Sequence, residues 1–342
     1  MIQAYSLDEA DEWDAIVRSS PGYEVHYLSG YARAFCLGQD TTPLLLVYRD
    51  DGGRAIQAVT RRDVASAPRL AQVVESGAWF DYASPYGYGG FLEDGDVNWA
   101  RLAAEYADHC RASRVVCEFV RFGLYSEYAA HFPGTARVAM HNVVRTLDPP
   151  LEDIRRDYEH KVRKNIRRAA DSGLELAADP AGDHRDEFLR IYYATMERTG
   201  ANADFYFRRE FFDALTAMSG NLTWFHAVLA GRVVSSELVL HDATNAYSFL
   251  GGTDAEYFPL RPNDFLKDGI IQWAKAQGLR RFVLGGGHGT DDGIFRYKRS
   301  FAPNGVVDFR VGSLVHEPTE YARLCALSGV QDGSGYFPAY RA

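Results

Sequence analysis

One order of secondary-structure elements occurs twice along this chain of 342 residues. In the first half, residues 43–62 contain two β-rich runs on either side of Asp-Asp-Gly-Gly, which is the pattern of a β-hairpin. A segment rich in aromatic residues and glycine follows at 77–91. An amphipathic helix is then predicted over 97–113 and a buried strand over 114–120. The order is therefore hairpin, third strand, helix and strand.

The second half repeats this order. Another hairpin is predicted over 222–240, and a second aromatic and glycine-rich stretch follows at 246–258. A helix is predicted over 261–278 and a strand over 280–287. The two halves share the pattern rather than the residues, so the pattern alone indicates an internal duplication of an α/β unit.

The duplication predicts two domains. We place them at residues 1–145 and 146–325, with an extended tail at 326–342, because this tail is rich in Gly, Ser, Pro and Tyr. A length of 342 residues is also typical of two domains. Three further helices are predicted between the two copies, at 151–171, 183–199 and 207–218.

The composition excludes several classes of protein. Hydrophobic residues make up 46% of the chain and charged residues 24%, which excludes a disordered or fibrous protein. No apolar run reaches the roughly 18 residues that span a bilayer, and the acidic N-terminus lacks the apolar core of a secretory signal. The four cysteines are widely spaced and form no CxxC pair. We therefore expect a cytoplasmic location and no metal site.

Charge is concentrated in one strip. The net charge is −9, yet residues 155–168 hold seven basic and two acidic residues, a local charge of +5. A basic strip on an acidic protein favours contact with a specific polyanion. A solvated face of the helix predicted over 151–171 is the alternative.

Three segments of the second half carry a resemblance to a known family. They are HKVRKNIRRAADSGLEL at 160–176, the segment from YSFLGGTDAEYF to VLGGG at 247–287, and GIFRYKRSFAPNGVVDF at 293–309. They resemble the Fem family of aminoacyltransferases, over roughly the last 150 residues, and the first half matches in pattern. The resemblance implies a mixed α/β fold of two tandem GNAT-like acyltransferase domains. No long helical hairpin is inserted, so the compact FemX type is the better comparison.

The resemblance also implies an activity. Fem enzymes form an amide bond between an amino acid carried by aminoacyl-tRNA and an amine of a peptide-like acceptor. The acceptor is a cell-wall precursor or a peptide or nucleoside natural product, and aminoacyl-tRNA is a co-substrate with no other cofactor. A GNAT N-acyltransferase that uses acyl-CoA or another thioester is the alternative, and a non-catalytic tandem GNAT module that binds RNA or a peptide is a third. The sequence does not indicate the oligomeric state.

Lys298, in the motif FRYKRSF, is the main predicted catalytic residue. The resemblance places it beside the reacting carbonyl, where a cation stabilises the oxyanion of a tetrahedral intermediate. An exposed lysine on a helix is the alternative. Tyr297 and His288 are the other predicted catalytic residues, and His288 in GGGHG is either a general base or part of a polar turn. Asp254 and Asp264 are alternative proton acceptors.

The predicted binding residues lie in both halves. Tyr86 and Tyr88, separated by glycine, line the acceptor cleft or pack inside a connector. Arg208 resembles an arginine that contacts the nucleotide-linked acceptor in FemX-like proteins, although Phe212 replaces the tyrosine of that pair and an exposed helical arginine is equally possible. The remaining predicted contacts are Tyr247, Arg261 and Asn263 for the substrate and Arg163, Lys164, Arg167 and Arg168 for tRNA phosphates.

Overall fold

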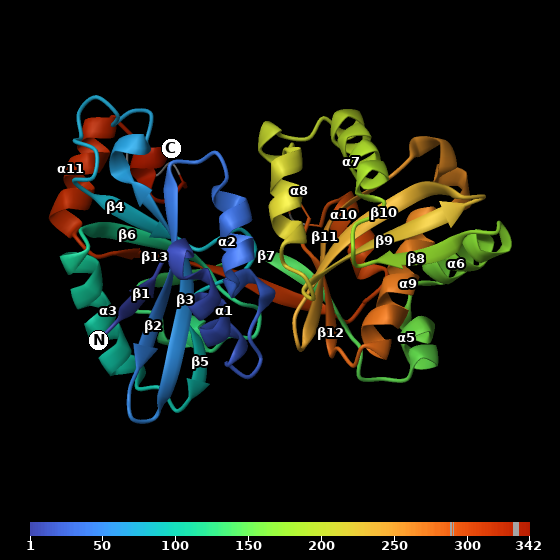
Figure 1. The fold of residues 1–342 in the computed structure, drawn as a ribbon, viewed down its shortest axis with the longest axis horizontal. Helices are drawn as coiled ribbons and strands as arrows, with labels where there is room; N and C mark the ends of the chain where they lie inside the picture. The colour runs from blue at the N-terminus through green and yellow to red at the C-terminus, as the bar shows by residue number, and fades with distance from the viewer. Residues whose placement is uncertain (288, 290, 331–334) are drawn as a thin grey trace. The chain divides into compact units, whose positions relative to one another are not determined.

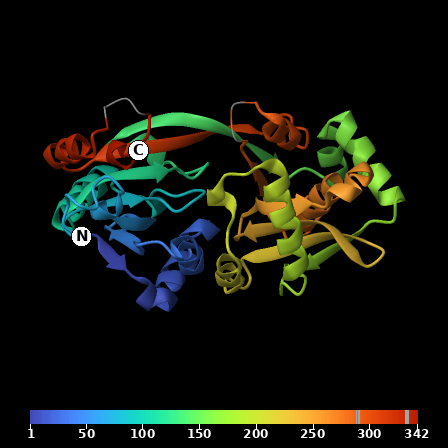
Figure 2. The ribbon, with the colours of Figure 1, turned by 90° about the horizontal axis from the view of Figure 1, so that it is seen from above.

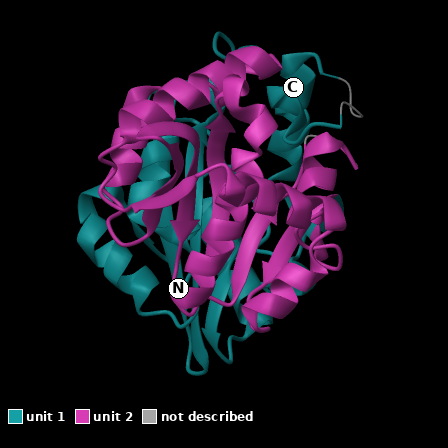
Figure 3. Ribbon diagram, turned by 90° about the vertical axis from the view of Figure 1, so that its right-hand side faces the viewer, with its two compact units in different colours: residues 1–139, 309–342 teal, residues 140–308 magenta. Residues whose placement is uncertain are grey.

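The computed structural model describes residues 1–287, 289, 291–330 and 335–342 (Figure 1). The chain divides into two compact units (Figure 3). Unit 1 comprises residues 1–139 and 309–342, and unit 2 comprises residues 140–308. Both units contain a mixed sheet with helices, which confirms the predicted α/β class.

Unit 1 contains the first copy of the repeated order. Its strands, in spatial order, are β1 (Gln3–Tyr5), β2 (Thr41–Arg49), β3 (Gly53–Asp63), β4 (Phe80–Ala83), β6 (Val115–Arg121) and β13 (Val306–Val315), and β5 (Leu92–Gly95) pairs with β3. Its helices are α1 (Ala10–Arg18), α2 (Ser29–Cys36), α3 (Trp99–Ala112), α4 (Tyr128–His131) and α11 (Pro318–Ser328). The hairpin β2–β3 is antiparallel, and β4 and β6 are parallel because α3 connects them.

Unit 2 contains the second copy. Its strands, in spatial order, are β7 (Thr135–Thr146), β12 (Arg281–Gly285), β11 (Asn245–Thr253), β10 (Arg232–His241), β9 (Leu222–Leu229) and β8 (Glu175–Asp179). Its helices are α5 (Leu151–Asp157), α6 (His160–Asp171), α7 (Arg185–Thr199), α8 (Arg209–Thr216), α9 (Pro262–Ala276) and α10 (Gly293–Arg299). The hairpin β9–β10 is antiparallel and β11 is parallel to β12, so the predicted duplication is confirmed in the strand pairing as well.

The alternation of side chains along β9 explains how helices cover the unit 2 sheet. Phe225 contacts Trp273 of α9. The preceding residue, Trp224, contacts Phe188 of α7 and Phe212 of α8. Successive residues of a strand point to opposite faces. Therefore α7 and α8 cover one face of this sheet and α9 covers the other (Figure 2).

Unit 2 is one continuous stretch of chain, whereas unit 1 is built from two segments. β7 follows β6 in sequence but pairs with β12 of unit 2, and β13 follows unit 2 but pairs with β6 of unit 1. The structural units therefore differ from the predicted domains 1–145 and 146–325, since residues 309–325 belong to unit 1. Sequence order alone does not reveal that β13 pairs with β6.

The C-terminal segment is not the extended tail that we predicted for 326–342. It contains the end of α11 and a short 3₁₀ turn at Ala339–Arg341. Tyr340 is buried in a cluster with Leu324 and Cys117, and its hydroxyl donates a hydrogen bond to Asp81 at 2.9 Å. Aromatic burial thus fixes this segment against unit 1.

The helix predicted over 151–171 is wrong as a single element. α5 and α6 are separated by Tyr158 and Glu159, both with ψ of 147°. Tyr158 is buried and its hydroxyl donates to Asp268 at 3.2 Å, so the break lets this ring enter the core. None of the helices in the described part of the chain has the length and hydrophobicity to span a bilayer.

Candidate active site

A pocket of about 590 Å³ lies within unit 2. Its walls come from α7, β10, the second half of β11, the start of α9, and α10. β11 pairs with β12 only over Asn245–Tyr247, and the pocket is lined by the residues of β11 that follow this pairing, 248–253. The divergence of two parallel strands therefore positions this pocket at the start of the helix that connects them.

Lys298 lines this pocket from α10. Its ammonium donates a hydrogen bond to the carbonyl oxygen of Gly286 at 2.6 Å. Burial lowers the pKa of Lys298 to about 8, the charge of Lys267 lowers it further, and Glu237 and Asp292 oppose both effects. At neutral pH the group is mostly a cation with two N–H groups that bond none of the described residues, which suits it to stabilise an anion in the pocket.

Tyr297 supplies an unpaired hydroxyl to the same pocket. Its oxygen is buried and has no hydrogen-bond partner among the described residues. Burial, with the charges of Asp264 and Glu237, raises the pKa of Tyr297, so the hydroxyl keeps its proton and can donate. Thr195 of α7 also has a buried, unpaired hydroxyl and lines the pocket. Buried polar atoms without partners are costly, so this pair of hydroxyls indicates a site for a polar ligand.

A buried ion pair on the pocket wall was not predicted. Lys267 of α9 donates to Glu237 of β10 and, at 2.7 Å, to the hydroxyl of Ser248. Both charged side chains are buried and line the pocket. The signal in the sequence is a charge inside an apolar pattern, in SSELVL and in FLKDGII, but the pattern does not show that the two charges meet.

Asp264 is a second carboxylate at the pocket, besides Glu237. It lies in the first turn of α9, is buried, and accepts a hydrogen bond from Asn165 of α6 at 3.1 Å. Burial raises the pKa of Asp264, while Asn165, Arg261 and Lys161 oppose this effect. Asp254 is instead paired with Arg190 and Arg232, at 3.2 and 3.1 Å, and is not among the pocket residues.

The basic strip divides into two groups. Arg155 pairs with Asp268, Arg156 pairs with Asp153, and Arg163 donates to the carbonyl oxygens of Arg156, at 2.8 Å, and of Tyr158. The exposed members, which have no ion pair or hydrogen bond within the described ranges, are Lys161, Lys164, Arg167 and Arg168. α6 packs against α9, so this exposed basic face of α6 adjoins the element that begins at the pocket.

The other predicted residues take different positions. Arg261 and Asn263 line the pocket. Arg208 is exposed at the start of α8, and Tyr247 is buried in β11 with its hydroxyl accepting from Asn245 at 3.2 Å; neither is among the pocket residues. His288 lies outside the described residues.

The two predicted tyrosines of the first half belong to unit 1. Tyr86 is half exposed and stacks on Phe35, with ring centroids 5.5 Å apart. Tyr88 is buried and its ring meets His26 and Phe309 edge to face. Within unit 1, then, Tyr86 keeps a surface for a ligand and Tyr88 serves mainly in packing.

Comparisons with known proteins agree with this architecture. Residues 156–299, all within unit 2, match the family described as acetyltransferase (GNAT) domain. The search of curated proteins found no match for this chain.

Similar solved structures cover both units. The structure of FemX is 12% identical with a TM-score of 0.70, covering 94% of this chain and 99% of that one. The L-PGS of Bacillus licheniformis is 12% identical with a TM-score of 0.58, covering 88% and 91%. The C-terminal domain of a putative lysylphosphatidylglycerol synthetase from Agrobacterium fabrum is 13% identical with a TM-score of 0.55, covering 96% and 98%. The chain therefore has the FemX-type fold of two tandem GNAT-like units, and the GNAT match supports an acyltransferase.

Proposed function

We propose that this chain is an aminoacyltransferase that joins an amino acid, carried as an ester on tRNA, to an amine of a peptide-like acceptor. The observation that carries the proposal is the unit 2 pocket, which is lined both by Lys298 and by Tyr297, whose hydroxyl has no partner among the described residues. The FemX-type fold and the similarity of FRYKRSF to the closing motif of the Fem family support it.

The pocket offers what aminolysis of an ester needs. The acceptor nitrogen attacks the ester carbonyl carbon, a C–N bond forms, and the carbonyl oxygen becomes an oxyanion that the Lys298 ammonium and the Tyr297 hydroxyl stabilise. The C–O bond to the ribose then breaks. The proton released by the amine passes to the leaving ribose oxygen, either through water or through the carboxyl group of Asp264, whose pKa burial raises. No nucleophile from the protein is required.

The charges near the pocket support a polyanionic donor. Arg261 and Arg198 line the pocket, both exposed, and the exposed basic face of α6 lies on the neighbouring helix. Cations that have no acidic partner are available to phosphates, and phosphate contacts position a nucleic acid without reading its sequence. This arrangement suits the acceptor end of a tRNA, with the amino acid in the pocket.

The acceptor is a peptide-like amine, from a cell-wall precursor or a natural product. Phe212, which replaces the tyrosine of the FemX-like pair, is fully buried between Phe188 and Trp224 and presents no polar group. Arg208 alone remains exposed at that position. An acceptor without the nucleotide of the cell-wall precursor fits this loss of a hydroxyl better.

A thioester donor is the second candidate, because the matching family model describes acetyltransferases. Backbone N–H groups at a helix start hold the pyrophosphate of such donors. Here Pro262 occupies the first position of α9 and has no N–H, and Arg261 before it has a φ of 63°. The start of α9 therefore offers fewer donors, which favours the ester donor.

Donor consumption distinguishes the two candidates. The full chain is incubated with a mixture of charged tRNAs and, separately, with acetyl-CoA, each with a panel of amines, and products are read by mass spectrometry. The proposal expects amide products and deacylated tRNA that depend on both protein and amine. Acetylated amines from acetyl-CoA, with charged tRNA left intact, would overturn it in favour of the second candidate.

A further inference from the structure

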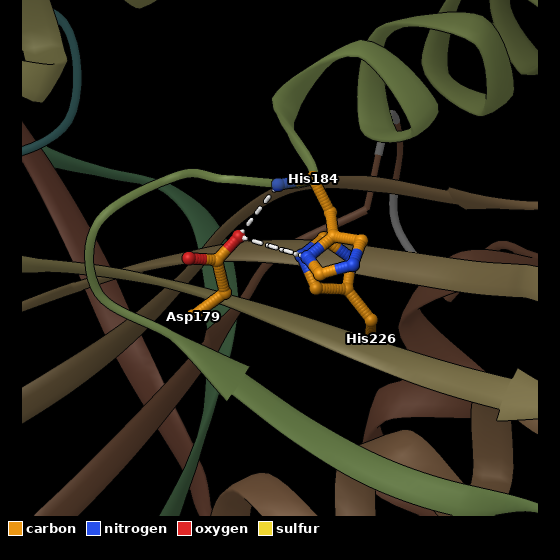
Figure 4. Close-up of side chains that lie close together, drawn as sticks. All are labelled: Asp179, His184 and His226. Atoms are coloured by element: carbon orange, nitrogen blue, oxygen red, sulfur yellow. Dashed lines mark hydrogen bonds and ion pairs between the residues drawn. The ribbon is translucent and has the colours of Figure 1, made fainter. Parts of the chain in front are cut away.

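A second cluster of polar side chains lies in unit 2, apart from the residues that line the pocket. Asp179 ends β8, His184 directly precedes α7, and His226 lies in β9 (Figure 4). The three side chains point toward one another, and one ligand atom of each lies within 4.8 Å of the other two.

The distances centre on one oxygen of Asp179. Its Oδ2 lies 3.6 Å from Nδ1 of His184 and 3.5 Å from Nε2 of His226. The backbone N–H groups of Gly182, Asp183 and His184 donate to the same carboxylate at 2.7, 3.0 and 2.9 Å. These three hydrogen bonds fix the carboxylate in place.

His226 is the deepest member of the cluster. Its side chain is fully buried, and its Nδ1 lies 2.8 Å from the hydroxyl of Ser236. Its Nε2 has no hydrogen-bond partner of normal geometry among the described residues and faces Asp179. An imidazole with one nitrogen held by an oxygen and the other left over is arranged as histidine is when it binds a metal.

We propose that Asp179, His184 and His226 form a binding site for a divalent transition metal such as Zn²⁺, with one position left for water. Two imidazoles and a carboxylate are a ligand set that Zn²⁺ takes in proteins. With metal–ligand bonds of about 2.0–2.2 Å, tetrahedral ligands lie about 3.3–3.5 Å apart. The observed 3.5 and 3.6 Å need little adjustment, and His184, half exposed, is free to turn inward.

The position of the site indicates a structural role. A bound ion would tie the loop between β8 and α7 to β9, and α7 supplies Thr195 to the pocket wall. Ser236, which holds the second nitrogen of His226, also lines the pocket. Metal binding would therefore stabilise one wall of the pocket and leave the reacting groups unchanged.

Metal binding is measured on the full chain after dialysis against a chelator. Calorimetric titration with Zn²⁺ should show one tight site, Co²⁺ should give the visible absorption of a tetrahedral ion, and Zn²⁺ should raise the unfolding midpoint, because it binds the folded state. Ser236→Ala should weaken Zn²⁺ binding roughly 10- to 100-fold, as the loss of an outer partner does. His184→Ala, at a half-exposed position, should weaken it further while the fold persists.

The matched control is His160→Ala, which removes an exposed histidine of α6 and should leave Zn²⁺ binding unchanged. All variants keep the four cysteines, so a thiol site would bind Zn²⁺ equally in each. Equal Zn²⁺ affinity of the original chain and His184→Ala, or no binding by the original chain, would overturn the proposal. The cluster would then serve only to begin α7.

Discussion

The backbone of Gly285 and Gly286 holds the Lys298 side chain in place. Its ammonium donates a hydrogen bond to the carbonyl oxygen of Gly286. Gly285 has a φ of 80°, and a Cβ atom at this position would lie 3.3 Å from the ammonium nitrogen. A residue with a side chain at 285 would be strained in this conformation and would crowd the ammonium. The glycines of VLGGG thus allow the backbone to approach Lys298.

Replacing Lys298 tests its role in the transition state. Lys298→Ala should lower kcat/KM about 100-fold, close to 3 kcal/mol of transition-state stabilisation, with the free energy of unfolding little changed. Arg296→Ala, an exposed residue of the same helix that does not line the pocket, is the control and should keep full activity. Near-normal turnover by Lys298→Ala would contradict the role.

The pH dependence of transfer follows from the lowered pKa of Lys298. Below about pH 8 the ammonium is present, and above it the proton and the positive charge are lost, so the rate should fall as the pH rises through 8. In Lys298→Arg the guanidinium stays charged, so whatever rate this variant has should show no such fall. Single-turnover rates over the pH range measure this, and a fall shared by both proteins would assign it to another group.

The sequence predicts individual site residues better than the contacts between residues that are distant in the sequence. Lys298, Tyr297, Arg261 and Asn263 come from segments that carry the family resemblance, and all four line one pocket. Glu237 and Lys267 were missed because their pairing depends on strand and helix packing. The cluster of Asp179, His184 and His226 was missed for the same reason, since its members come from two strands and a loop rather than from one short motif.

The basic residues of α6 fall into two groups, one bonded within the protein and one exposed to solvent. Lys164 and Arg167 are exposed on it, while Arg163 turns back to the carbonyls that precede the helix. Periodicity predicted helical structure on both sides of Tyr158 and an exposed basic face. It did not predict the break at Tyr158, because that break depends on a hydrogen bond to Asp268 from a distant helix.

The salt dependence of donor binding tests the exposed face of α6. In Lys164→Gln/Arg167→Gln, binding of charged tRNA should weaken, because two cations that neutralise phosphates are removed. The slope of log K against log salt should flatten by roughly one unit for each phosphate that is no longer neutralised. Filter binding at several salt concentrations measures it.

The control for that measurement removes two exposed arginines of unit 2 that already have carboxylate partners, Arg209→Gln/Arg280→Gln. It has the same net charge change and should keep the original slope. If the two double variants bind charged tRNA alike, the face of α6 is only solvated.

Arg163 should behave differently from its neighbours. Because its guanidinium bonds two backbone carbonyls at the junction of α5 and α6, Arg163→Ala should lower the free energy of unfolding by about 1 kcal/mol. Arg168→Ala, exposed on the same helix, should have little effect on stability. Urea denaturation measures both, and equal stability of the two variants would show that the Arg163 bonds contribute nothing.

Each of the two units contains one copy of the same order of elements. Each copy supplies its own hairpin, third strand, helix and parallel strand, which the sequence pattern predicts because these elements are consecutive. β13 follows unit 2 in the sequence but pairs with β6 of unit 1, and no local pattern encodes this pairing. The pairing of strands that are distant in the sequence could not be predicted from the sequence.

Buried charge in unit 1 makes stability depend on pH. Burial raises the pKa of Glu118 from 4.5 to about 7, opposed by the hydrogen bond that Tyr106 donates at 2.6 Å. The raised value means that the folded state binds a proton more tightly than the unfolded chain. The contribution of Glu118 to the free energy of unfolding should therefore be fully present below about pH 4.5. It should fall by up to about 3 kcal/mol as the pH rises to 7.

Glu118→Gln should remove this slope, because an amide does not titrate. Glu127→Gln, at an exposed position of the same unit, should keep it. Denaturation at several pH values between about 4.5 and 7 measures the three proteins, and parallel slopes for all of them would show that Glu118 is not the source.

We propose that acyl transfer takes place in the unit 2 pocket. The most direct measurement is a crystal structure with a short RNA of the tRNA acceptor end that carries its amino acid through a stable amide in place of the ester. The account predicts the amino-acid carbonyl oxygen about 3 Å from the Lys298 ammonium, with the RNA phosphates on the exposed face of α6. A carbonyl bound outside this pocket, or away from Lys298, would contradict it.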